Sequence, residues 1–219
     1  MKKRTAHLCF CTVYCVLGLV GLVLDFKLLS GSPTARPFVF YTSWSNMLCS
    51  GFMLASLLRN IRQKDASQAF APVCKFLFTV MILLTAVVHN FLLEYHSSVL
   101  SYFLDVKNCL HHLILPVLFF LDWLFFYPKG TLKLWQPVLS PVIPLTYVCY
   151  ILARAAFVRQ LGITVNVLYP YFFLNVEKTG WQGFGLWMGI LFVMLLALGY
   201  GIYGIDRMLQ RKQGVSADV

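Results

Sequence analysis

The chain has 219 residues, of which 59% are hydrophobic and only 12% are charged, and its mean hydropathy is +0.74. Soluble domains carry about a quarter charged residues, so this composition excludes an ordinary soluble globular protein. The net charge of +10 does not indicate a nucleic-acid-binding protein, because most Lys and Arg residues fall in short segments between apolar runs, where such residues set membrane topology.

Several apolar runs reach the roughly 20 residues that a helix needs to cross a bilayer. The runs are continuous rather than alternating, which favours helices over a barrel. We therefore predict an all-α membrane protein, a six-helix transmembrane bundle with an internal cavity. It forms one domain over residues 1–207, and a cytoplasmic tail follows over 208–219. The predicted spans are about 7–25, 38–58, 72–93, 109–127, 138–157 and 182–204.

Six spans place both termini on the same side of the membrane. The start "MKKR" precedes an apolar run without a small-residue cleavage site, which predicts a retained first span rather than a signal peptide. The side of the termini, with Lys75 among its residues, carries twice as many Lys and Arg residues as the other side. This asymmetry predicts cytoplasmic termini. The second and fourth spans then begin, and the third ends, at the outer boundary.

Polar residues follow one face of the second predicted span. Thr42, Ser45, Asn46, Cys49 and Ser50 recur at helical spacing, so they share a stripe that faces protein or water rather than lipid. Small polar residues commonly pack helices together in membranes. Taken alone, this stripe favours such a packing role.

The start of the fourth predicted span carries a second polar group. Asn108, His111 and His112 lie within one helical turn, and Asp105 precedes them. The end of the third span brings further polar residues to the same depth: His89, Glu94 and His96. Polar groups inside a membrane are costly unless they are paired, and they indicate function by default. The alternative is a histidine that only hydrogen-bonds neighbouring helices together.

Together the two polar groups indicate nucleophilic chemistry. A threonine hydroxyl is a weak nucleophile that needs a neighbouring base, and the base needs an orienting partner. We predict Thr42 as the nucleophile and His112 as the base, with Asn108 or Asp105 fixing its tautomer. Asn46 lies one turn after Thr42 and is the candidate donor to an oxyanion, with Ser45 as a weaker candidate for the same role.

Metal binding is the main chemical alternative. His89, Glu94, His96, Asp105 and the two adjacent histidines offer enough ligands for zinc. The sequence contains no H-x-x-x-H, H-E-x-x-H or C-x-x-C spacing, and its seven cysteines fall mostly inside apolar runs. We therefore predict neither a metal nor a cofactor.

Three motifs, taken in order, resemble one known family. "FYTSWSNMLCS" (40–50), "LHHLILPVLFFLDWLFF" (110–126) and "LYPYFFLNV" (168–176) are similar to the androgen-inducible family of six-span membrane threonine hydrolases, and most similar to its bacterial branch. The resemblance covers roughly residues 35–180. From the residues alone, the aromatic third motif is an interfacial belt, or else the rim of a groove that admits lipid.

The resemblance implies a function and two catalytic residues. Animal members of the family cleave fatty acid esters of hydroxy fatty acids with one Thr and one His inside the membrane. Carried over by motif, these residues are Thr42 and His112. Ser43 and His111 are adjacent alternatives: anchoring the match on Pro116 with the animal pattern favours His111, whereas the bacterial pattern favours His112.

We therefore expect an intramembrane hydrolase of lipid or long-chain acyl esters. Its expected partners are a lipid or acyl-ester substrate and the bilayer, and no nucleic acid. Its expected location is a bacterial inner membrane, with multiple spans and cytoplasmic termini. The alternative is a non-enzymatic protein that binds or transports a lipid or small molecule along a polar intramembrane pathway.

Overall fold

The computed structural model describes residues 2–63, 69–93 and 98–215. All regular structure in these ranges is helical, so the predicted all-α fold is confirmed. The α-helices are α1 (Lys2–Asp25), α2 (Tyr41–Arg62), α3 (Pro72–Val88), α4 (Val99–Leu104), α5 (Val106–Cys109), α6 (Leu115–Phe126), α7 (Val142–Gln160) and α8 (Val176–Val215). The 3₁₀ segments are η1 (Arg36–Val39), η4 (Gln136–Leu139) and η5 (Phe172–Leu174), and the π-helical segments are η2 (His89–Leu93) and η3 (Leu110–Ile114).

Among the described residues, five helical stretches are long and apolar enough to cross a membrane: Lys3–Asp25, Pro72–Leu93, Val106–Phe126, Gln136–Gln160 and Val176–Arg211. They coincide with five of the six predicted spans and support a multi-pass membrane protein. Helix α2 has 22 residues and is long enough. It is missing from this set because its polar stripe lowers its hydropathy.

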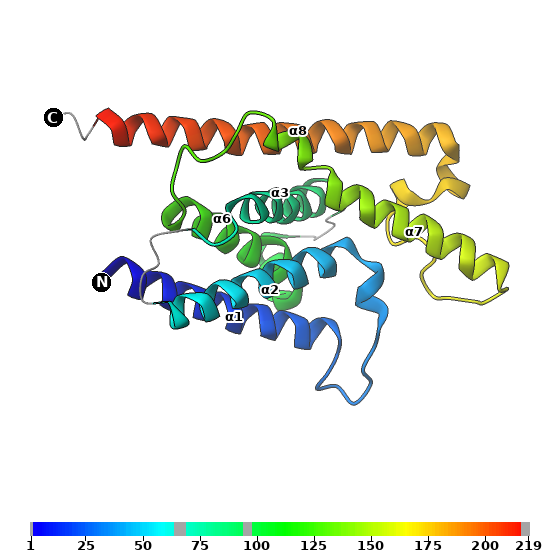
Figure 1. Cartoon of the computed structure of the whole chain (residues 1–219). Coiled ribbons are helices and arrows are strands. Elements are labelled where there is room, and N and C mark those ends of the chain that lie inside the picture. Colours follow the sequence, from blue (N-terminus) through cyan, green and yellow to red (C-terminus); the bar gives the residue numbers. More distant parts are fainter. Residues whose placement is uncertain (1, 64–68, 94–97, 216–219) are drawn as a thin grey trace.

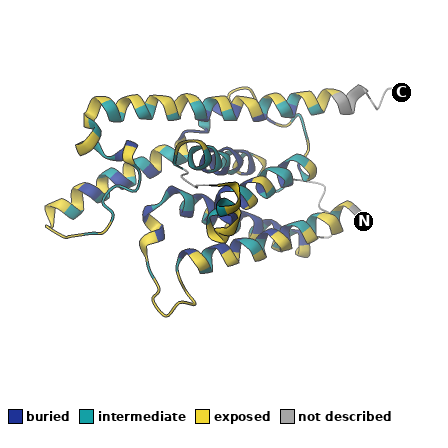
Figure 2. Ribbon diagram, turned by 180° about the vertical axis from the view of Figure 1, so that it is seen from behind, coloured by how far each residue is buried: buried dark blue, intermediate teal, exposed yellow. Residues whose placement is uncertain are grey.

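Helix α3 lies in the middle of the bundle (Figures 1 and 2). It packs against α2, α6 and α8, while α1 packs against α2 and α6. Burial agrees with this arrangement. In an apolar 18-residue stretch of each helical range, 44% of residues are buried in Pro72–Leu93 and 50% in Val106–Phe126, against 17% in Val176–Arg211. The outer helices therefore present their apolar side chains outward, as helices surrounded by lipid do.

Helix α8 runs along one side of the bundle (Figure 1). It bends at Gly180, whose φ of 66° is open to glycine without a steric cost. The part after the bend, residues 181–215, spans about 50 Å at 1.5 Å per residue, which is longer than the hydrocarbon layer of a bilayer. The extra length carries Arg207 and Arg211. The C-terminal end of α8 lies at the end of the bundle where α1 begins (Figure 1).

A buried ion network joins the central helices. Asp122 lies 2.8 Å from Lys75 Nζ and accepts a 2.9 Å hydrogen bond from His7 Nε2, while Asn60 contacts His7 Nδ1 at 3.1 Å. The Lys75 ammonium also lies 3.2 Å from the centre of the Phe119 ring. The structure thus corrects the counting of Lys75 among the topology-setting charges, because this side chain is fully buried.

Candidate functional site

A polar cavity of about 710 Å³ lies at the end of the bundle away from the termini. It forms where α1 ends, α2 begins, α3 ends and α5 begins, so it is built by four helix ends that are distant in sequence. Its lining includes Asp25, Thr42, His89, Lys107, His111 and His112. The structure therefore brings together Thr42, His89, His111 and His112, which the sequence analysis assigned to one membrane face.

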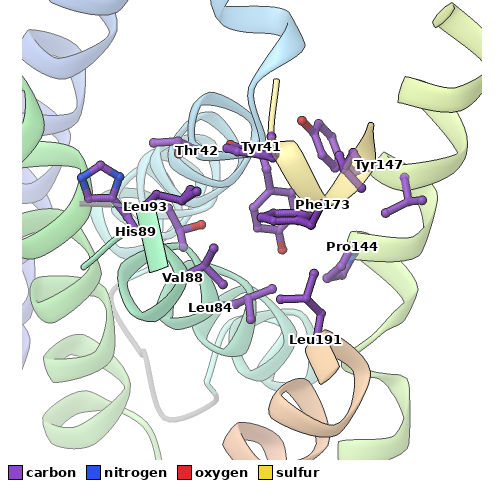
Figure 3. Close-up of a pocket in the computed structure, with 14 residues that line it drawn as sticks. Tyr41, Thr42, Leu84, Val88, His89, Leu93, Pro144, Tyr147, Phe173 and Leu191 are labelled. Carbon is purple, nitrogen blue, oxygen red and sulfur yellow. The ribbon is translucent and has the colours of Figure 1, made fainter. Parts of the chain in front are cut away.

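A smaller apolar pocket of about 60 Å³ adjoins this cavity. Residues of α2, α3, η2, α7, η5 and α8 line it. Figure 3 shows Thr42 and His89 at one end of the pocket, with Pro144 and Leu191 at the other. Three residues line both spaces: Thr42, His89 and Tyr171. Thr42 therefore lies at the junction between a polar cavity and an apolar pocket.

Thr42 is half-buried in the first turn of α2. The Tyr171 hydroxyl interacts with its side chain and with the Tyr41 and Thr42 backbone. Burial raises the pKa of the Tyr171 phenol, although these interactions with Thr42 and Tyr41 lower it in part. The phenol therefore keeps its proton at neutral pH, and a protonated hydroxyl beside Thr42 can both donate and accept hydrogen bonds.

The neighbouring Ser43 has a different environment. Its hydroxyl donates a 2.5 Å hydrogen bond to Asp25 Oδ2, and Asp25 Oδ1 pairs with Lys107 Nζ at 2.7 Å. This chain of contacts ties α1, α2 and α5 together at the wall of the polar cavity. Of these two residues, Thr42 lines both spaces, whereas Ser43 lines only the polar cavity.

Ser45 and Asn46 form contacts between helices. Ser45 Oγ contacts Thr85 Oγ1 at 2.8 Å and donates to the Thr42 carbonyl at 2.9 Å. Asn46 Nδ2 donates to the Thr42 carbonyl at 2.8 Å and to the His111 carbonyl at 3.4 Å. For either residue to donate to an oxyanion, one of these hydrogen bonds would have to break and a hydrogen bond to the oxyanion would have to replace it.

The two adjacent histidines are buried but held differently. His111 Nδ1 donates to the Lys107 carbonyl at 3.1 Å, and its Nε2 faces α1, 2.8 Å from the position of a Cβ on Gly21. The His112 ring interacts with the Thr85 backbone, and its buried Nδ1 has no hydrogen-bond partner among the described residues. We therefore infer that Nε2 carries the His112 proton and that Nδ1 presents a lone pair.

His112 also stacks on His89, with ring centroids 3.4 Å apart and planes 8° from parallel. Two positive charges at this distance would repel each other by about 5 kcal/mol at an effective dielectric constant of 20.

The remaining predicted site residues lie nearby. Asp105 caps α5 by accepting the Asn108 backbone N–H at 3.0 Å, and Asp105 and Asn108 both line the polar cavity. Glu94 and His96 lie outside the described residues. Within the described ranges, the one group of three or more histidines, cysteines and carboxylates arranged as metal ligands lies elsewhere: His7, Cys11 and Asp122. There Asp122 already has Lys75 and His7 as partners.

The sequence analysis missed the roles of Tyr171 and His89 in this arrangement. The "LYPYFF" motif was interpreted as a belt or rim, and His89 as one residue of a polar group. No spacing rule signals either role, because their position beside Thr42 depends on how η5 and η2 fold back onto α2. Comparisons with protein-family models, curated proteins and solved structures find no match to this chain.

Proposed function

We propose that this chain hydrolyses a lipid or long-chain acyl ester inside a membrane, with Thr42 as the nucleophile and His112 as the base. The observation that carries the proposal is the position of Thr42 at the junction of an apolar pocket and a polar cavity lined by buried imidazoles. An acyl ester has the same division between an alkyl chain and a polar carbonyl group. The reaction requires no cofactor.

The proposal includes six membrane spans, with α2 as the sixth. The polar stripe of α2 points inward, since Ser45 and Asn46 are buried, whereas Leu54 and Leu58 are 48% and 44% exposed. An apolar outer face and a polar inner face suit a helix that packs within a bundle in lipid. We also propose cytoplasmic termini and a bacterial inner membrane as the location.

In the proposed reaction, Thr42 Oγ forms a bond to the carbonyl carbon and its proton moves to His112 Nδ1. The Tyr171 hydroxyl donates to the oxyanion that develops on the carbonyl oxygen. The C–O bond to the alcohol breaks, and the alcohol leaves with the proton from His112. Water then attacks the acyl-threonine with His112 again as the base, which releases the fatty acid and restores Thr42.

The test is turnover of a panel of long-chain acyl esters by purified protein in detergent. Thr42→Ala and His112→Ala should each lower kcat by roughly 10²-fold or more. Ser43→Ala and His111→Ala are the matched neighbours and should retain most activity. Wild-type activity in all four variants would contradict the proposal. Labelling of Thr42 by a fluorophosphonate probe would support it.

The polar cavity is much larger than the apolar pocket, which favours a second candidate, a protein that binds or transports a polar lipid or small molecule. It predicts that wild-type protein binds the ester and releases it unchanged. Recovery of intact ester after saturable binding would therefore favour this candidate over hydrolysis.

A further inference from the structure

His89 and His112 each lie in a π-helical segment, His89 in η2 and His112 in η3. Such segments are rare in proteins and occur frequently at functional sites. Here two of them face each other, and the stacked rings form their contact.

The contact between the two π-helical segments is not limited to the stacked rings. The two segments are also bonded directly, because Asn90 Nδ2 donates to the His112 carbonyl at 3.0 Å and to the Ala86 carbonyl at 2.8 Å. The backbone positions of the stack are therefore fixed from both sides.

The stack lies beside the proposed nucleophile. His89 lines both spaces with Thr42, whereas His112 lines only the polar cavity. One face of the His112 ring is thus covered by His89, and the buried His112 Nδ1 has no hydrogen-bond partner in the part of the chain that the structure describes. The charged and titratable groups around the cavity are Asp25, Lys27, Arg36, Asp105, Lys107, His111 and Tyr171.

We propose that His89 is a positioning residue, whose stacked ring holds the His112 imidazole in the orientation that takes the Thr42 proton. This inference rests on the proposed hydrolase function. In this proposal His89 transfers no proton itself. A flat aromatic ring without nitrogen should therefore support His112 as well as His89 does, whereas a polar side chain that is not aromatic should fail to do so.

The kinetic test compares His89→Ala, His89→Gln and His89→Phe in detergent-purified protein. Misplacing a catalytic group can cost about 10²-fold in rate, so His89→Ala and His89→Gln should lower kcat by about that factor with KM unchanged. The His89→Phe variant should keep most of the wild-type kcat. The matched control is Phe91→Ala, which changes an 86% exposed residue of the same segment and should leave kcat unchanged. A kcat of His89→Phe that is no higher than the kcat of His89→Ala would overturn the inference.

A second measurement separates this inference from the hydrolase proposal. The ring Cε1–H signal of His112, assigned with His112→Gln in histidine-labelled protein, should lose its ring-current shift in His89→Ala and keep it in His89→Phe. If wild-type protein cleaves no ester in the panel, the hydrolase proposal fails, and the positioning of His112 is still decided by this signal. A signal that does not move in His89→Ala would overturn the inference.

Discussion

Lys75 Nζ lies 2.8 Å from Asp122 Oδ2 in the interior of the bundle, and neither side chain is exposed. Removing one partner of such a pair leaves an uncompensated buried charge, which costs about 3–5 kcal/mol. We expect Asp122→Asn and Lys75→Met each to lower the unfolding temperature in detergent markedly. The double variant Lys75→Met/Asp122→Leu should recover part of the loss, because it buries no unpaired charge. Single variants that unfold at the wild-type temperature would contradict this interpretation.

The second prediction concerns the contact of α1 with the site. A Cβ on Gly21 would lie 2.8 Å from His111 Nε2, and one on Gly18 would lie 2.5 Å from Ser50 Oγ. Overpacking of this kind typically costs about 1–3 kcal/mol, so Gly21→Ala should destabilise the protein in thermal unfolding. Gly51→Ala is the matched control, since nothing lies within 4 Å of its Cβ position, and it should be neutral or slightly stabilising. Equal unfolding temperatures for the two variants would contradict the close packing of α1.

The third prediction tests Tyr171 as the donor to the oxyanion. Tyr171→Phe keeps the ring, which stacks on Phe173, and removes only the hydroxyl. Loss of one such donor costs about 10²–10³-fold in kcat, so kcat should fall while KM stays near the wild-type value. Steady-state kinetics on the best ester of the panel measure this. A change confined to KM would show that the hydroxyl contributes to binding rather than to catalysis.

The fourth prediction is a pH dependence of stability at the opposite end of the bundle. Burial lowers the pKa of Lys129 to about 8 from an ordinary value of 10.5. Between these values the unfolded chain holds a proton that the folded protein has released, so stability rises as pH increases from about 8 to 10.5. Below pH 8 both states are protonated and this dependence disappears.

Unfolding temperatures at pH 7.5 and pH 10 measure the effect. The wild-type protein should gain more stability between these two pH values than Lys129→Gln does. Lys133→Gln, at an exposed neighbouring lysine, should keep the wild-type difference. Identical pH dependence in wild type and Lys129→Gln would exclude Lys129 as its source.

Much of the fold follows from the sequence because each helix is specified locally. The length of each apolar run determines whether it can cross a bilayer, and five of the six predicted spans coincide with long apolar helices of the described residues. The alternating direction of the spans also predicts that Thr42, His111 and His112 lie at one end of the bundle, since the second and fourth spans begin on the same side. The order and direction of the spans are therefore enough to predict that these three residues lie at the same end of the bundle.

The side-chain partners could not be predicted in the same way. Lys75 counts in the sequence as a charge near a loop, yet it is buried against Asp122 and Phe119. Similarly, helical periodicity places His89 on an α-helix, but it begins the π-helical segment η2 and its ring stacks on His112. These contacts depend on the rotation of each helix about its axis and on local changes in helical winding.

The sequence by itself determined the helical membrane class and the end of the bundle at which polar residues gather, because hydropathy and span order act on each segment separately. Only the tertiary structure decided that Thr42 borders both a polar cavity and an apolar pocket, that Ser43 bonds to Asp25, and that His112 stacks on His89. The physical reason is that these relationships depend on packing between helices distant in sequence, which no single helix encodes.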